Sequence, residues 1–172
     1  MDAIFILQRA INISSSPLFI CFIDLKAAYD WINRDMLFKI LDIRLNSPIL
    51  VNILRVFYNG TSAAIKGSKI FFKTFTGCKQ GGLESPVLFN IFLDFVLRIA
   101  EHEVLQQFPN TGLHYSYRIP GHCSSREQRS VHGLSGDQRL RMILYADDIA
   151  LMCGDIEELS EILKIFYTHY LK

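Results

Sequence analysis

Two adjacent acids, Asp147 and Asp148, stand between two short and mostly apolar runs at 141–144 and 149–152. Apolar segments joined by a short acidic break predict a buried β-hairpin with the acids at its turn. Carboxylates beside a hydrophobic core are costly unless something offsets their charge. Because hard oxygen ligands suit Mg²⁺ or Mn²⁺, the pair indicates a divalent cation site that needs a further acid from elsewhere in the chain.

Asp24 is the candidate for that third acid. Residues 19–25 are apolar except for Asp24 and have the length of a strand covered on both faces. If this strand is a neighbour of the acidic hairpin, three carboxylates converge at one place and repel one another unless cations neutralise them. Two metals about 3.5–4 Å apart would do so, and would also activate a hydroxyl and stabilise a leaving phosphate. Taken from the residues alone, the acidic pair could equally be ordinary turn or cap residues.

The elements expected to position these acids alternate between helices and hairpins. Strands that pair through hairpins and are separated by helices predict an α+β fold, an antiparallel sheet with helices packed on one face. The predicted elements are a helix at 2–13, a strand at 19–25, a short helix around 36–41, a helix from Ser47-Pro48 to Asn59-Gly60, a hairpin with arms at 61–66 and 69–75, a long helix from Ser85-Pro86 to about His102, an inserted loop or ribbon at 106–138, and a helix that Asp155 and Glu158 cap.

Composition limits the classes of protein to consider. The chain has 172 residues, half of them hydrophobic, which fits one domain with a sizeable core. No apolar run reaches the roughly 18–20 residues that span a bilayer, so no membrane partner is expected. The net charge is +1, and this near-neutral total predicts little autonomous binding of nucleic acid. The charge is uneven, however: residues 106–141 carry five arginines against two acids, and residues 145–172 carry two lysines against six acids.

Three blocks of the sequence resemble the palm of a reverse transcriptase. Residues 22–30 read FIDLKAAYD, residues 77–90 read GCKQGGLESPVLFN, and residues 145–148 read YADD. The amino-acid sequences of these blocks are most similar to those of non-LTR (LINE-like) retrotransposon enzymes, with group II intron enzymes as more distant relatives. The resemblance implies the antiparallel palm sheet of right-hand polymerases, with its ferredoxin-like core. It also implies RNA-directed DNA synthesis with two Mg²⁺ ions, for which Mn²⁺ could substitute.

The resemblance assigns roles to single residues. It makes Asp24 and Asp147 the metal-binding catalytic carboxylates and Asp148 the supporting third acid. It also assigns a nucleotide-binding set, in which the backbone carbonyl of Leu25 completes a metal shell and the ring of Tyr29 stacks under the sugar and excludes a 2′-hydroxyl. Gln80 and Gly81 form the turn against the incoming nucleotide and template, and Ala146 is the second residue of the acidic block. The residues alone leave Tyr29 open as a core aromatic and Gln80-Gly81 as an ordinary loop before a helix.

The sequence departs from the family pattern in two respects. Relatives usually read Gln-Gly-(Cys or Asp)-Pro-Leu-Ser-Pro, whereas this chain has Gly82-Leu83-Glu84 between Gln80-Gly81 and Ser85-Pro86. The loss of the first proline and the added charge of Glu84 affect the expected handling of the template. In addition, the resemblance covers a palm domain but not the complete fingers and thumb that usually flank it. We therefore expect residues 1–18 to be a residual fingers or palm helix, and the thumb and most of the fingers to be absent from the chain.

The predicted function is that of a palm core of an RNA-directed DNA polymerase, working on an RNA template, a DNA primer and deoxynucleoside triphosphates within a fuller enzyme. Activity of the isolated chain is not expected. The alternative from another class is a catalytically inactive remnant or binding module of a decayed retroelement. Another palm-fold nucleotidyltransferase, such as a cyclic-dinucleotide synthase, lacks support, because Gln80-Gly81 and the block at 145–148 indicate a templated polymerase. An intracellular setting is expected, and a nuclear one if the enzyme acts where the element integrates.

Overall fold

The computed structural model describes residues 3–67, 69–118 and 135–170. The chain divides into two compact units, each described by itself below. The sheet unit comprises Met1–Asp24 and His102–Lys172, and the hairpin unit comprises Leu25–Glu101. The long helix α4 (Ser85–Gln107) begins in the hairpin unit and ends in the sheet unit.

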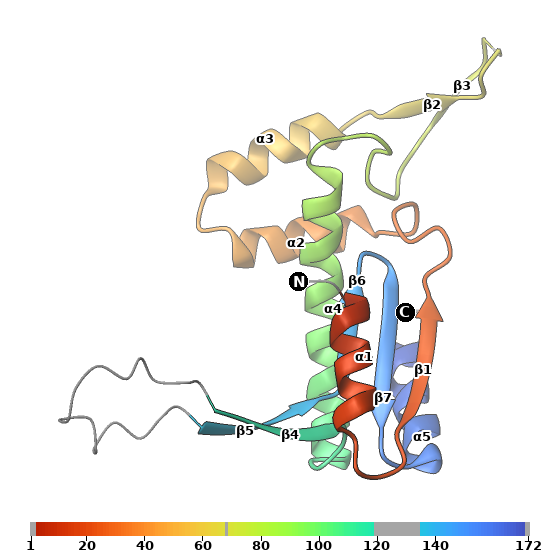
Figure 1. Ribbon diagram of the computed structural model, residues 1–172. Coiled ribbons are helices and arrows are strands. Elements are labelled where there is room, and N and C mark those ends of the chain that lie inside the picture. Colours follow the sequence, from red (N-terminus) through yellow and green to blue (C-terminus); the bar gives the residue numbers. More distant parts are fainter. Residues whose placement is uncertain (1–2, 68, 119–134, 171–172) are drawn as a thin grey trace, which may run out of the picture. The chain divides into compact units, whose positions relative to one another are not determined.

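The sheet unit is built on three antiparallel strands in the order β1-β7-β6. These are β1 (Phe19–Asp24), β6 (Met142–Tyr145) and β7 (Asp148–Cys153). The central strand, β7, pairs with β1 from Phe19 opposite Cys153 to Asp24 opposite Asp148. The predicted acidic hairpin and its pairing with the strand that ends at Asp24 are therefore both present (Figure 1).

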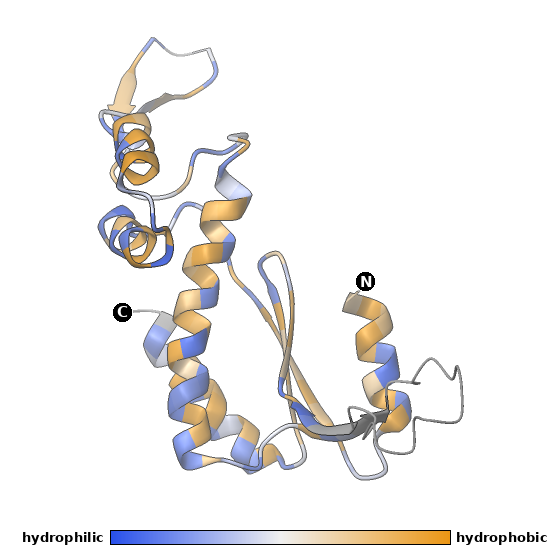
Figure 2. Cartoon of the chain, turned by 90° about the vertical axis from the view of Figure 1, so that its left-hand side faces the viewer, coloured by the Kyte–Doolittle hydropathy of each residue, from blue (hydrophilic) through white to orange (hydrophobic). Residues whose placement is uncertain are grey.

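Helices cover both faces of this sheet (Figures 1 and 2). Helix α1 (Ala3–Ile13) packs on the face that carries Ile143, Ala150 and Met152. Helix α5 (Ile156–Tyr170) packs against β7 and β1 from the other side. The α+β class with an antiparallel sheet is confirmed, but the expectation of helices on one face was wrong. The reason is that every residue of β7 from 149 to 153 is buried, so this strand requires cover on both faces.

The ends of several elements follow the predicted local signals. The side chain of Asp155 accepts hydrogen bonds from the backbone N–H groups of Glu157 and Glu158, at 2.8 and 3.0 Å, and so caps α5. Helix α4 extends to Gln107, beyond the predicted end at His102, because Val104 in the added turn is buried. The predicted insert contains a ribbon of β4 (Leu113–Arg118) and β5 (Ser135–Leu140). The part of the insert at 119–134 lies outside the described residues.

The hairpin unit contains two short helices, a small hairpin and the start of α4. The elements before α4 are α2 (Arg34–Arg44), α3 (Pro48–Tyr58), β2 (Ser62–Ala64) and β3 (Phe71–Lys73). The strands β2 and β3 form the predicted hairpin, although each is only three residues long. The core of this unit includes the fully buried side chains of Leu37, Leu41, Val51 and Phe89. Among the described helices of the chain, none combines the length and apolar character that crossing a membrane requires.

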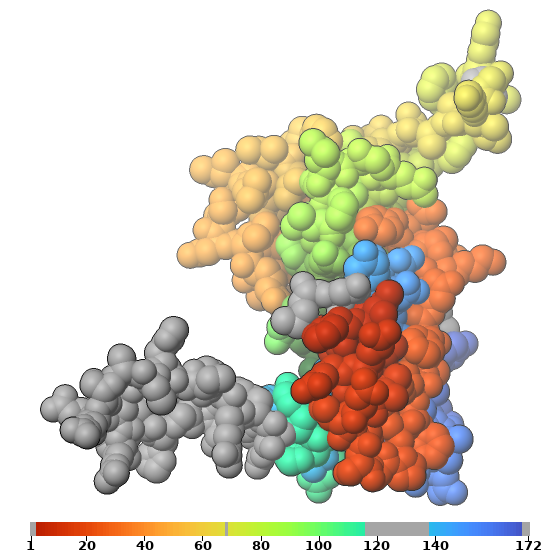
Figure 3. All heavy atoms as spheres, viewed as in Figure 1, coloured from red at the N-terminus to blue at the C-terminus, as the bar shows by residue number. Residues whose placement is uncertain are grey.

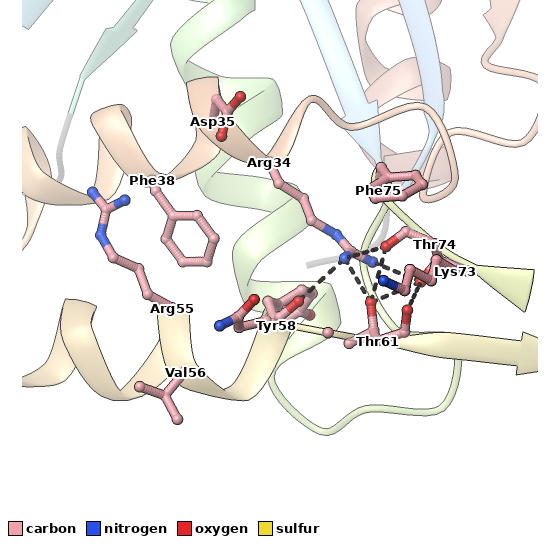
Figure 4. A pocket seen from close by; sticks show the side chains of 12 residues that line it. Arg34, Asp35, Phe38, Arg55, Val56, Tyr58, Thr61, Lys73, Thr74 and Phe75 are labelled. Carbon is pink, nitrogen blue, oxygen red and sulfur yellow. Dashed lines mark hydrogen bonds between the residues drawn. The ribbon is translucent and has the colours of Figure 1, made fainter.

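Arg34 binds both ends of this hairpin, at Thr61 and Thr74 (Figure 4), and also the loop that follows it. Its Nε donates to the carbonyl of Gly77 at 2.8 Å, and its Nη1 donates to Thr61 Oγ1 at 2.7 Å and to the Thr74 carbonyl at 3.0 Å. Its guanidinium also lies 5.2 Å from the ring centre of Tyr58. One cation therefore satisfies acceptors at both ends of the hairpin and at the start of the 77–85 loop, which orders these parts together.

Gly77 sits where two backbone segments approach too closely for a side chain. Its φ is +78°, and a Cβ built there would lie 2.8–2.9 Å from backbone atoms of Tyr29 and Asp30. The approach is fixed by hydrogen bonds from the Gly77 N–H to the Ile32 carbonyl and from the Cys78 N–H to the Tyr29 carbonyl, each at 2.8 Å. This contact joins the 25–32 segment to the 77–85 loop.

We predict that Gly77→Ala destabilises the chain by about 3 kcal/mol, because the strain of a positive φ adds to a steric overlap with backbone that cannot move aside. Gly67→Ala is the matched control, since Gly67 has a φ of +88° but an added methyl group there would have nothing within 4 Å. It should cost about 1 kcal/mol. Urea denaturation of the two variants measures the difference, and equal losses would contradict the assigned role of Gly77.

Candidate active site

Asp24, Asp147 and Asp148 lie at one end of the three-stranded sheet. Asp148 is paired directly with Asp24 of β1 on one side and with Tyr145 of β6 on the other. Paired residues of neighbouring strands project from the same face, so the two carboxylates are cross-strand neighbours. By strand alternation they share this face with Ala150, which packs under α1.

The turn that carries Asp147 is as short as a hairpin allows. Tyr145 and Asp148 close the ladder, which leaves Ala146 and Asp147 as the two turn residues. Ala146 has a φ of +54°, an uncommon conformation for a residue with a side chain. A positive φ at the first of two turn residues is the pattern of type II′ hairpins, which normally place glycine there. Strain at this alanine therefore accompanies the tight presentation of Asp147 beside Asp148.

The charge of the three acids is uncompensated by the rest of the described chain. Asp24 and Asp148 are exposed and Asp147 is half-buried. Within the described ranges none of the three carboxylates accepts a hydrogen bond or forms an ion pair. Like charges directly opposite each other across a strand pair are destabilising. The observed donors are thus hard, anionic oxygens without protein partners, and such a set fits a divalent cation.

The side chains are not drawn together into a finished ligand set. Among the residues that the structure describes, no group of three histidine, cysteine, aspartate or glutamate side chains is arranged to hold a metal ion. The backbone register thus brings the three acids to one place, while their carboxylates remain apart. A cation binding there would have to draw the carboxylates toward itself.

The nucleotide-binding candidates Leu25, Tyr29, Gln80 and Gly81 belong to the hairpin unit. Tyr29 is half-buried and its ring stacks on that of Phe89, with centroids 4.5 Å apart and planes inclined by 17°. That contact fixes the plane of the tyrosine ring. Leu25 is buried, and its carbonyl accepts a hydrogen bond from the Ala28 N–H at 3.2 Å, which leaves one lone pair for another partner.

Gln80 is held in place by Asp30. Its Nε2 lies 3.0 Å from one carboxylate oxygen of Asp30 and 3.3 Å from the other. The two residues are 50 positions apart in the sequence, and Gln80 carries one of the predicted nucleotide-binding roles. Gly81, by contrast, has a φ of +80° and open space around it, so only its backbone conformation requires glycine.

The hydroxyl of Tyr58 contacts the 77–85 loop, to which Gln80 belongs, and this role was not identified from the sequence. Its hydroxyl lies 3.3 Å from Glu84 Oε1, 3.4 Å from Ser85 Oγ and 3.4 Å from the Lys79 N–H. Burial raises the pKa of the Tyr58 phenol, which keeps it protonated and able to donate. Burial likewise raises the pKa of Cys78, so this cysteine is a protonated, packed thiol and not a nucleophile. Tyr58 stands in an apolar helix, and no sequence pattern distinguishes it from a core residue.

Comparison with known proteins bears on the family of the chain. A family model described as reverse transcriptase (RNA-dependent DNA polymerase) matches residues 5–172. A comparison with curated proteins gave no match. The family match spans almost the whole chain and includes the acidic end of the sheet, Tyr29 and the 77–85 loop, and on this basis the chain belongs to the reverse transcriptase family.

Proposed function

We propose that this chain supplies the palm of an RNA-directed DNA polymerase of the non-LTR retrotransposon type and works by two-metal nucleotidyl transfer. The observation that carries the proposal is the pairing of Asp24 with Asp148 beside the Asp147 turn. The amino-acid sequences of the blocks at 22–30, 77–90 and 145–148 support the non-LTR assignment. The proposed partners are an RNA template, a DNA primer and deoxynucleoside triphosphates.

In the proposed reaction the 3′-hydroxyl of the primer attacks the α-phosphate of the nucleotide, and pyrophosphate leaves. Asp24 and Asp147 would hold two Mg²⁺ ions, with Asp148 as the supporting acid. Bound divalent cations supply charge neutralisation at the phosphates and activation of the attacking hydroxyl. The remaining contribution of the protein is orientation, because phosphoryl transfer asks for little covalent chemistry from side chains.

The hairpin unit offers groups suited to selecting and orienting a nucleotide. The ring of Tyr29 is held by Phe89 and would act as a rigid barrier to a ribose 2′-hydroxyl. The bond from Gln80 to Asp30 would fix the side chain that lies against the incoming nucleotide. Gly81 would let the backbone approach the substrate closely.

We predict that Asp147→Asn abolishes primer extension on an RNA template with Mg²⁺, with a loss of at least about 10³-fold, because the substitution removes an anionic oxygen ligand and its charge. The assay compares the chain as given and a longer polypeptide extended at both ends. Asp42→Asn is the matched control, because Asp42 pairs with Arg55 in the hairpin unit and carries no proposed role. Retained synthesis with Asp147→Asn would refute the metal assignment. If both polypeptides were inactive without any substitution, the remnant hypothesis would replace the enzyme.

We predict that Asp24→Asn raises the free energy of unfolding in metal-free buffer by about 0.5 kcal/mol, because it removes a like-charge cross-strand pair. Adding Mg²⁺ at about ten times its dissociation constant should stabilise the unsubstituted chain by about 1.4 kcal/mol and leave Asp24→Asn unaffected. Thermal unfolding with and without Mg²⁺ measures both effects. Equal stabilisation of the two proteins by Mg²⁺ would place the cation somewhere other than at Asp24.

We predict that Tyr29→Ala raises the incorporation of ribonucleotides relative to deoxynucleotides about tenfold or more, because a cavity replaces the rigid ring. Tyr29→Phe keeps the ring and the stacking on Phe89, so it should keep the discrimination. Primer extension by the extended polypeptide with each class of nucleotide measures the ratio. An unchanged ratio for Tyr29→Ala would show that this ring does not exclude the 2′-hydroxyl.

A further inference from the structure

The positive charge of the hairpin unit is concentrated in a long stretch without acids. Residues 43–83 contain no aspartate or glutamate. Their basic residues are Arg44, Arg55, Lys66, Lys69, Lys73 and Lys79. The near-neutral total of the chain hides this local excess, which has the sign required to bind a polyanion.

Three of these six cations already have protein partners. Arg44 pairs with Asp94 at 2.7 Å, and Arg55 pairs with Asp42. Lys79 donates to the Phe57 carbonyl at 2.6 Å and lies over the ring of the same residue. Lys66, Lys69 and Lys73 belong to the β2–β3 hairpin, and none of their ammonium groups is paired within the described ranges. The uncompensated charge therefore lies on the hairpin.

The same hairpin exposes three aromatic rings. Phe71, Phe72 and Phe75 are 72%, 51% and 78% exposed. Phe71 and Phe72 stand opposite Ala64 and Ala63, whose methyl groups are too small to cover a ring. Phe71 and Lys73 also alternate onto one face of β3, so a ring and a cation are presented together. The hairpin stands out from α2 and α3 of its own unit (Figures 1 and 3).

The base of the hairpin is anchored and borders a pocket (Figure 4). The pocket has a volume of about 490 Å³, and Lys73, Phe75, Arg34 and Phe38 are among the residues that line it. Hydrogen bonds from Arg34 and the 2.7 Å contact between the hydroxyls of Thr61 and Thr74 hold this base. Two strands of three residues are marginal by themselves, so this anchoring is what keeps the rings and lysines in register.

We propose that the β2–β3 hairpin binds an unpaired strand of nucleic acid, with bases stacked on Phe71, Phe72 and Phe75 and phosphates held by Lys66, Lys69 and Lys73. Exposed aromatic rings interleaved with cations are the arrangement by which proteins hold single strands without reading their sequence. The lack of aspartate and glutamate at 43–83 favours this occupant over a protein partner. The proposal rests on the proposed function, in which the primer is base-paired and the RNA template ahead of it is not. The strand is therefore the RNA template.

The test is a binding measurement with the full chain, by fluorescence anisotropy of a labelled RNA template. One template is annealed to a DNA primer along its whole length, and another carries a 5′ RNA overhang of about 12 nucleotides. The overhang should increase the affinity of the unsubstituted chain. The double variant Phe71→Leu/Phe72→Leu keeps apolar side chains but removes the rings, and it should lose about tenfold in affinity for the overhang template.

The lysines are tested by the salt dependence of the same binding. Replacing Lys66, Lys69 and Lys73 by Gln should reduce the slope of log affinity against log salt concentration by about 2, the value expected for three phosphates of a single strand. Tyr167→Leu and Lys39→Gln are the matched controls, since both side chains are exposed and belong to helices α5 and α2, not to the hairpin. Both should bind as the unsubstituted chain does.

The result that overturns the proposal is an overhang affinity that the ring and lysine variants leave unchanged while their thermal unfolding stays normal. An equal loss of affinity for the blunt and overhang templates would also overturn it, because the hairpin would then not distinguish an unpaired strand. Asp147→Asn separates this proposal from the proposed function, since it should abolish synthesis and leave binding of the overhang intact. Failure of either experiment therefore leaves the other interpretable.

Discussion

The structure depends on the pairing of β1 with β7, two strands that the sequence separates by more than a hundred residues. Six residue pairs align them in register, and the last pair is Asp24 with Asp148. Because side chains alternate along a strand, a shift of one residue would move Asp24 to the opposite face from Asp148. The buried apolar residues of β7 fix that register by packing under α1 and α5. Packing of the core thus sets the position of the acids.

Much of this arrangement could be predicted from local patterns. The apolar run that ends in Asp24 and the YADD turn have signatures of strand and hairpin, and convergence of the acids follows if the strands are neighbours. The double covering of the sheet was indicated only in part: the apolar run at 19–25 predicts a strand covered on both faces, but it does not identify the helices that cover the sheet. Helix α1 has an ordinary amphipathic pattern, and a pattern of this kind does not identify the surface on which a helix packs. The buried state of β7 is the physical fact that requires α1.

The interactions that could not be predicted are polar contacts between residues that are far apart in the sequence and belong to no recognisable motif. Arg34 stands at the start of a helix, yet its guanidinium holds Thr61, Thr74 and Gly77 together. Gln80 was assigned a nucleotide contact, and the structure adds that Asp30 already orients its amide. Such contacts produce no repeating pattern in the sequence, because each is a single polar pair between residues that only the fold brings together. The family pattern identifies Gln80 but does not indicate that Asp30 is its hydrogen-bond partner.

Two sets of charges in the described chain lack partners, and they have opposite signs. The three aspartates at the end of the sheet oppose one another without a cation, and the three lysines of the β2–β3 hairpin stand among exposed aromatic rings without an anion. A protein that had to satisfy these groups internally would pair them, as it pairs Arg44 with Asp94. The paired aspartates repel each other across the strands, and both sets would gain a function if ligands supplied the missing charge. The proposed polymerase would meet both requirements, because metal ions would neutralise the aspartates and the polyanionic template would neutralise the lysines.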